Sequence, residues 1–202
     1  MRTVLKNGSE VCHIWAQFPN RQENGRAGNI FFEGDSIYSY GRHFKIARFI
    51  DDHTIFFTVR DYSNSTAKHK HYVSRAIRYS DSVFYVPSLD AHHDVNINYL
   101  MKEIRDEKER VMRARKYIET GTLENRIENL QKYLARFGKD LPIYKEAKKF
   151  LKSKIITAND RKKLATKQEK LNVYVAQAGE RAEKRRVLEE EKEKTKIPRW
   201  RD

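Results

Sequence analysis

The alternation of apolar and polar residues between Ile30 and Phe57 constrains the fold more than any other feature of this sequence. Aromatic and β-branched side chains alternate with polar ones, which is the pattern of strands that bury one face. Acidic and turn-forming triplets at 33–35 and 51–53 interrupt the pattern. The stretch predicts a small antiparallel sheet with strands over 29–32, 36–40, 44–49 and 54–59.

The residues on either side predict a few more elements. Short strands are expected at 3–5 and 11–18, with an exposed loop over 20–28, where two glycines and several charges follow Pro19. Ser63, Asn64 and Ser65 are capping residue types, and the apolar residues after them recur at helical spacing. A helix over 65–78 and a strand over 83–86 should therefore complete the sheet unit.

Composition divides the chain into two parts. Charged residues make up 35% of the sequence, too many for one compact core, whereas aromatics at 11% are too many for a disordered chain. Most of the aromatics precede residue 100. The fold class expected is α+β: a small antiparallel sheet with one packed helix over 1–90, then a basic antiparallel helical bundle or coiled coil over 91–202.

Apolar residues at heptad spacing predict the helices of the second part. A first series ends before Thr120-Gly121-Thr122, and a second runs to Gly138, so the two predict an antiparallel hairpin with Glu107 as a polar residue in its seam. Such a seam must be covered, which favours self-association through the helical region. Third and fourth helices are expected from Asp140 and Thr157. The heptad residues are Ile97, Leu100, Ile104, Val111, Ala114 and Ile118, then Leu123, Ile127, Leu130, Leu134 and Phe137, and in the fourth helix Leu164, Leu171, Val175, Ala178 and Ala182.

Basic residues exceed acidic ones mainly in the second part. Residues 1–90 hold 12 Lys and Arg against 9 Asp and Glu, and residues 91–202 hold 30 against 19, for a formal net charge of +14. An excess of this kind favours a polyanionic partner, most commonly nucleic acid, although a solvated helical surface has the same composition.

The single cysteine, Cys12, excludes an intrachain disulfide. No apolar run approaches the ~18 residues of a membrane span, and the first residues do not resemble a signal peptide. We therefore expect a soluble protein of the cytoplasm, without membrane contact.

Tyrosines at 38, 40, 62 and 72 interleave with four cations, Arg42, Lys45, Lys68 and Lys70. Such interleaving is typical of surfaces that stack the bases and pair the phosphates of nucleic acid, although packing of structural tyrosines explains it almost as well. The charged end of the fourth helix adds further cations. The candidate nucleic-acid-binding residues are Tyr38, Tyr40, Arg42, His43, Lys45, Lys68, His69, Lys70, Arg181, Lys184, Arg185 and Arg186.

His43 and His69, with Tyr40, are candidates for acid/base catalysis in a metal-independent nuclease. The alternative, which we favour, is that both histidines make buried hydrogen bonds between sheet and helix. A metal site is not expected from His69, His71, His92 and His93, because they lack the spacing of known sites, and no glycine pattern indicates a phosphate-binding loop. No metal or cofactor is expected, and Gly41 is interpreted as a residue that permits a bulge.

The segments YSYGRHFKIA at 38–47 and YSNST at 62–66, with Asn29, Phe32, Gly34 and His69, resemble an uncharacterised domain of phage and other mobile-element proteins. The resemblance covers residues 12–80 and implies a phage setting in a bacterial host, but no catalytic roles. The function expected is that of a phage-type intracellular nucleic-acid-binding protein without catalytic activity. The alternatives are an inhibitor of a host defence system that binds a host protein, and the nuclease described above.

Overall fold

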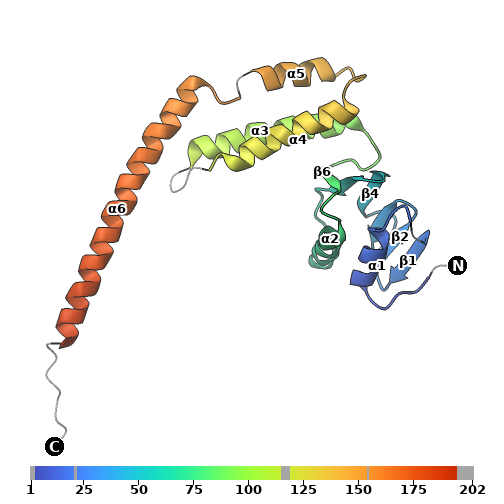
Figure 1. Cartoon of the computed structure of the whole chain (residues 1–202), viewed down its shortest axis with the longest axis horizontal. Helices are drawn as coiled ribbons and strands as arrows, with labels where there is room; N and C mark the ends of the chain where they lie inside the picture. The colour runs from blue at the N-terminus through green and yellow to red at the C-terminus, as the bar shows by residue number, and fades with distance from the viewer. Residues whose placement is uncertain (1–2, 21, 115–118, 154, 195–202) are drawn as a thin grey trace, which may run out of the picture.

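The computed structural model describes residues 3–20, 22–114, 119–153 and 155–194 of the chain, and the fold is α+β (Figure 1). A sheet unit lies at one end of the molecule. A bundle of helices lies beside it, and one long helix extends away from the bundle.

The described residues form a six-stranded sheet whose strands are neighbours in chain order. Its pairs are antiparallel except β5 with β6, which run parallel because helix α2 (Asn64–Ala76) crosses over between them. The predicted sheet is therefore mostly, not wholly, antiparallel. The strands are β1 (Asn24–Ala27), β2 (Ile30–Glu33), β3 (Ser36–Ser39), β4 (Lys45–Asp51), β5 (Thr54–Thr58) and β6 (Ser82–Val86).

The strand predicted over 11–18 is wrong, because these residues belong to helix α1 (Gly8–Trp15). Asn7 caps the helix by accepting a hydrogen bond from the Glu10 backbone N–H at 3.0 Å, and the Glu10 side chain accepts one from the Lys6 N–H at 2.7 Å. This arrangement is a variant of the capping box in which the carboxylate bonds to the N–H of the residue before the N-cap, and it outweighs the strand propensity of the apolar residues that follow. Val11 and Trp15, four positions apart, are both fully buried.

The loop predicted over 20–28 is also wrong, because Asn24–Ala27 forms the edge strand β1. A Cβ at Gly25 would lie 2.8 Å from the Phe32 ring, so glycine allows the two strands to approach. The strand expected over 3–5 is reduced to a bridge between Val4 and Arg26.

Two helices of the described chain, α1 and α2, cover one face of the sheet, where one was predicted. They pack on Ile30, Phe32, Ile37, Ile55 and Phe57 in a continuous buried cluster. The Trp15 indole N–H donates to the Asp35 carbonyl at 3.0 Å, which fixes α1 to the β2–β3 turn.

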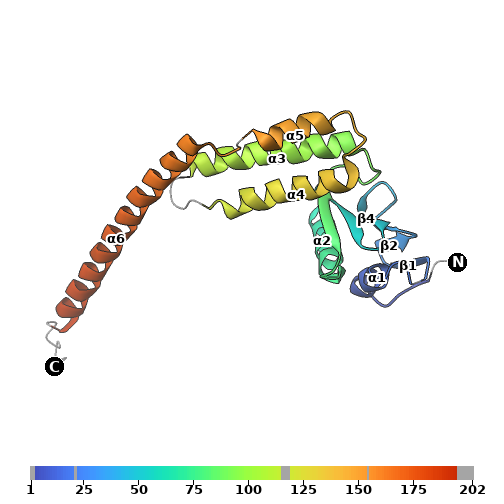
Figure 2. The same cartoon turned by 45° about the horizontal axis from the view of Figure 1, so that its top comes forward.

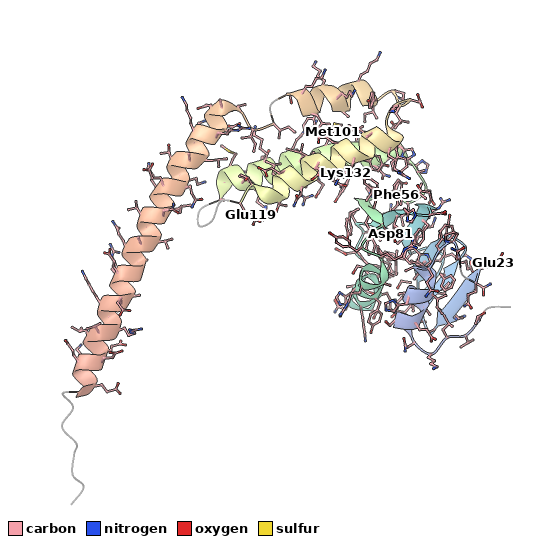
Figure 3. The ribbon with its side chains drawn as sticks, viewed as in Figure 1. Glu23, Phe56, Asp81, Met101, Glu119 and Lys132 are labelled. Atoms are coloured by element: carbon pink, nitrogen blue, oxygen red, sulfur yellow. The ribbon has the colours of Figure 1, made fainter. Side chains whose placement is uncertain are left out.

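The opposite face, at β5 and β6, is covered by an antiparallel hairpin of helices α3 (His93–Arg113) and α4 (Gly121–Phe137). Helix α5 (Tyr144–Lys152) packs against both helices (Figure 2). The buried residues include Phe56 of the sheet and Met101 of the hairpin (Figure 3). The hairpin prediction is confirmed, but the sheet and α5 cover the seam, so the hairpin needs no second copy of the chain; Ile118 lies outside the described residues.

The polar seam residue Glu107 is 5% exposed and is held by basic partners on both helices of the hairpin. Arg110 of α3 donates to its carboxylate at 2.6 and 3.1 Å. Arg126 of α4 lies 3.7 Å from it and also forms an ion pair with Glu103. Glu107 is thus a paired polar residue in the seam, as expected from its heptad position, and its partners on both helices favour one register.

A buried polar network joins the start of α3 to α4. The Asn96 side chain is fully buried and donates to the Tyr133 hydroxyl and the Ser88 carbonyl, both at 2.9 Å. Its oxygen accepts from the Ser88 N–H at 3.0 Å, and His93 Nδ1 lies 2.9 Å from the same hydroxyl. Burial raises the pKa of Tyr133 to about 12, so the hydroxyl stays protonated.

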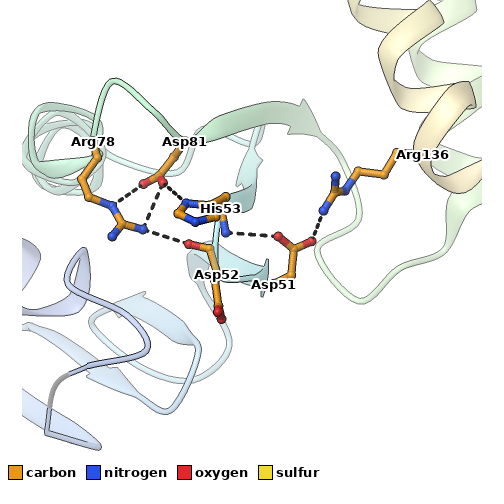
Figure 4. Close-up of polar contacts among 6 residues, drawn as sticks. All are labelled: Asp51, Asp52, His53, Arg78, Asp81 and Arg136. Atoms are coloured by element: carbon orange, nitrogen blue, oxygen red, sulfur yellow. Dashed lines mark hydrogen bonds and ion pairs between the residues drawn. The ribbon is translucent and has the colours of Figure 1, made fainter.

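A second polar cluster ties the β4–β5 turn to the helices around it (Figure 4). Asp51 accepts from Arg136 of α4 at 2.5 Å. On the other side of the turn, Arg78 donates to the Asp52 carbonyl at 2.8 Å and to Asp81. The turn therefore connects the sheet to the hairpin and to the segment between α2 and β6.

The last described element is helix α6 (Ala158–Lys194), which starts beside α3 and then extends alone (Figures 1 and 2). The predicted capping box is confirmed, because Thr157 and Asp160 exchange hydrogen bonds at 3.0 and 3.1 Å. Lys167 donates to the Met112 carbonyl of α3 at 3.0 Å, and beyond Leu171 the described residues of α6 are exposed.

Candidate nucleic-acid interface

The predicted site begins in the tight connection between β3 and β4. Tyr40 adopts a left-handed backbone conformation with φ of 63°, which is uncommon for a residue with a side chain. Its N–H donates to the Asn29 carbonyl at 2.6 Å, and its ring is 49% exposed. Gly41 makes room for His43, since a Cβ there would lie 2.7 Å from His43 Nδ1. The irregularity in strand register lies at 37–38, a few residues before Gly41.

His69 connects α2 to β3, in agreement with its predicted structural role. Its Nδ1 lies 2.7 Å from the hydroxyl of the buried Ser39. Burial lowers the pKa of His69, and the charge of Lys68 lowers it further. A neutral imidazole is therefore favoured at this position.

His43 is exposed, so the buried hydrogen bond predicted for it is wrong. Its ring lies 6.2 Å from that of Tyr62, whereas the ring of His69 lies 5.8 Å from that of Tyr40. The contacts of the two histidines thus lead to different neighbours, and no described contact joins them as an acid/base pair.

Tyr38, Arg42, His43 and Lys45 come together around an open cavity of about 540 Å³ at the end of the sheet. The cavity is also lined by residues of the β5 end and of the segment before α3, among them Arg60, Ser88, Asp90 and His92. Tyr38 stacks on Phe31 with ring centroids 5.1 Å apart. One face of the Tyr38 ring is thereby covered.

Most cations predicted for the sheet unit are already paired with acids. Arg42 forms two hydrogen bonds of 2.8 Å with Glu33, and Lys45 pairs with Asp90. The hydrogen bond from Lys45 lowers the pKa of Asp90, although burial acts against it. Lys70 pairs with Asp61 at 2.8 Å. These ion pairs reduce the net attraction of the sheet unit for phosphate.

Lys68 differs from these cations. Its ammonium lies 5.8 Å from the Tyr72 ring, and no ion pair links it to another described residue.

Helix α5 and the first half of α6 carry a larger set of cations, which we call the α5–α6 basic cluster. All are exposed, and none forms an ion pair with another described residue. The cluster consists of Lys145, Lys148, Lys149, Lys152, Arg161, Lys162, Lys163 and Lys170.

The predicted cations Arg181, Lys184, Arg185 and Arg186 lie further along α6, on exposed turns. Arg186 lies 3.1 Å from Glu183 and 3.5 Å from Glu190. Residues 180–196 hold seven basic and six acidic residues, whereas residues 139–170 hold eleven and four. The run with the denser charges is therefore nearly neutral overall, whereas residues 139–170 have a net charge of +7.

The described residues hold no group of three or more His, Cys, Asp or Glu side chains placed to bind a metal ion. None of their helices combines the length and apolar content needed to cross a membrane. Comparison of the chain with known protein families, with curated proteins and with solved structures finds no match.

Proposed function

We propose that this protein binds nucleic acid through the α5–α6 basic cluster, as a binding protein of the phage type suggested by its sequence. The observation that carries the proposal is the gathering of eight exposed cations without ion-pair partners among the described residues. Residues 139–170 have a net charge of +7, half that of the whole chain. Unpaired lysines of this kind attract phosphates and release their counterions.

The cluster favours nucleic acid over an anionic membrane as the partner. A helix that lies in a membrane interface needs an exposed apolar face. In α5 the apolar side chains are turned inward, since Ala147 is fully buried and the guanidinium of Arg105 lies 4.9 Å from the Phe150 ring. The exposed side of α5 carries four lysines and one acid, Glu146.

Lysine-to-phosphate contacts position a protein on nucleic acid without reading its sequence. We therefore expect binding with little sequence preference. Among the nucleic-acid-binding residues predicted in the sheet unit, three are exposed and form no ion pair with a described residue: Tyr40, His43 and Lys68. In this proposal they form a second, smaller contact surface.

The experiment is a comparison of two variants with the same change in net charge. The test variant replaces Lys145, Lys148, Lys149 and Lys152 with Gln. The control replaces four cations that are paired with acids, Lys102, Arg113, Lys132 and Arg186.

Affinity for labelled duplex DNA and duplex RNA is measured by fluorescence anisotropy at low salt. The proposal predicts a loss of at least tenfold in the test variant and a much smaller loss in the control. Equal losses would mean that only net charge matters, and absence of binding at low salt would refute the proposal. Nuclease-resistant capture of a host protein would instead support the inhibitor alternative.

A further inference from the structure

The middle of α6 exposes an apolar face on a helix that extends away from the rest of the molecule (Figures 1 and 2). Tyr174 is 67% exposed and Val175 61% exposed. Leu171, Val175, Ala178 and Ala182 follow one another at intervals of four, three and four residues, which places them on one side of the helix. An isolated helix gains little stability without tertiary contacts, so such a face favours a partner.

The same face carries a shallow hollow of about 210 Å³. It is lined by the short side chains of Ala178 and Ala182 together with four longer ones, those of Tyr174, Gln177, Arg181 and Arg185. Filling the hollow requires an apolar side chain larger than alanine.

We infer that two copies of this chain associate through antiparallel α6 helices, with residues 171–182 of each forming the common core. In an antiparallel pair of heptad helices, residues at core position a of one helix face residues at core position d of the other. Leu171 then faces Ala182 of the partner subunit, and Val175 faces Ala178 of the partner subunit. Each large side chain meets a small one and enters the hollow.

A parallel pair fits these residues less well. It would place Leu171 and Val175 each against its own copy, and would leave the alanines facing alanines across a gap. It would also bring Arg181 beside Arg186 of the partner subunit on both sides of the core, where like charges repel. In the antiparallel pair, Arg181 lies beside Tyr174 of the partner subunit, which allows a cation–π contact.

The charges at the ends of α6 support the same orientation. Residues 161–163 are Arg-Lys-Lys and residues 189–191 are Glu-Glu-Glu. With 171 opposite 182, residues 161–163 fall opposite residues 190–192 of the partner subunit, so each basic triplet meets two glutamates of the partner subunit. Leu164, only 8% exposed within its own chain, stays outside the shared core.

The first test measures mass by sedimentation equilibrium over a range of concentrations, on nuclease-treated protein at a salt concentration that removes nucleic acid. Val175→Glu places a charge in the proposed core, and Val173→Glu is the matched control, since Val173 is 54% exposed but lies on another side of the helix. Wild type and Val173→Glu should form dimers at the higher concentrations, and Val175→Glu should remain monomeric. A monomeric wild type, or equal behaviour of the two variants, would overturn the inference.

The second test decides the orientation. Ala165→Cys and Arg186→Cys are prepared separately and treated with a short bis-maleimide, alone and mixed. Cys12 is fully buried, and wild type controls for it. Antiparallel pairing predicts cross-linking in the mixture, because residue 165 then lies close to residue 186 of the partner subunit. It predicts little cross-linking in either variant alone, because the two copies of residue 165 are then separated by more than 20 residues along the helix pair. Cross-linking of each variant with itself would show a parallel pair. Neither test needs nucleic-acid binding, so failure of the proposed function would leave this result unaffected.

Discussion

Replacement of Tyr133 by Phe isolates the polar network that joins the α3–α4 hairpin at the sheet. The Tyr133 hydroxyl accepts from Asn96 and lies 2.9 Å from His93 Nδ1, while the ring packs between Phe56 and Phe137. The substitution removes the oxygen and keeps the ring. Any loss of stability therefore reports the polar contacts and not the aromatic packing.

The magnitude follows from what the lost hydroxyl leaves behind. Asn96 is fully buried and keeps its hydrogen bonds with Ser88, but one N–H of its side-chain amide loses its acceptor. An unsatisfied buried donor costs about 1–3 kcal/mol. His93 is partly exposed and can bond to water instead, so the total should stay within this range.

The measurement is urea unfolding of wild type and variant, with Tyr85→Phe as the control because Tyr85 is 49% exposed. Tyr133→Phe should lower the unfolding free energy by about 1–3 kcal/mol with little change in the denaturant slope. Tyr85→Phe should leave it nearly unchanged. A loss below about 0.5 kcal/mol for Tyr133→Phe would refute the proposed contribution of the buried network.

Three further predictions concern stability. Asn7→Ala should destabilise by about 1 kcal/mol in urea unfolding, because it removes the cap of α1. Leu130→Ala should destabilise by about 2–5 kcal/mol, because Leu130 is fully buried in the hairpin, whereas Leu188→Ala should have little effect. Burial and the Lys68 charge lower the folded-state pKa of His69 below its ordinary 6.5, so its contribution is fully present above pH 6.5 and is lost as the pH falls through the folded-state pKa. His69→Gln should make the unfolding free energy depend less steeply on pH in this acidic range, and the control His71→Gln should not.

Each of these predictions has a contrary outcome. An unchanged midpoint for Asn7→Ala would mean that capping does not define α1. Equal effects of the two leucine substitutions would contradict burial of the hairpin seam. If the unfolding free energy falls equally steeply with falling pH in His69→Gln and in wild type, His69 has the same pKa in the folded and unfolded chains.

Periodicity was sufficient to predict the elements that are amphipathic by themselves. The strands β2 to β6, helix α2 and the hairpin follow from period-2 and heptad patterns, although β5, with α1 and α2 on one face and the hairpin on the other, is buried on both faces. Helix α1 was missed because its apolar residues also fit a short strand, and the Asn7 and Glu10 capping box that decides between the two was overlooked. Strand β1 was missed because its two glycines and its charges resemble a loop, although it pairs with β2.

The candidate site was predicted only in part. The sequence predicted a binding site at residues 38–45, and four of its side chains do surround one cavity: Tyr38, Arg42, His43 and Lys45. It could not show that Glu33 and Asp90 neutralise two of these cations, because these contacts join residues 9 and 45 positions apart. The α5–α6 basic cluster was detectable as a segment with a net charge of +7, but the charges were summed only over 1–90 and 91–202, which is too coarse to locate it.

The salt dependence of binding tests the central claim most directly. Affinity for one labelled duplex is measured for wild type and for the variant with Gln at 145, 148, 149 and 152, over a series of salt concentrations. For wild type, the logarithm of the binding constant should fall linearly with the logarithm of the salt concentration. Each lysine that neutralises a phosphate adds about 0.9 to the slope, so the slope for the variant should be smaller by roughly 2 to 4. Equal slopes for the two proteins would show that these lysines do not contact phosphate, and would contradict the proposal that the α5–α6 basic cluster is the binding surface.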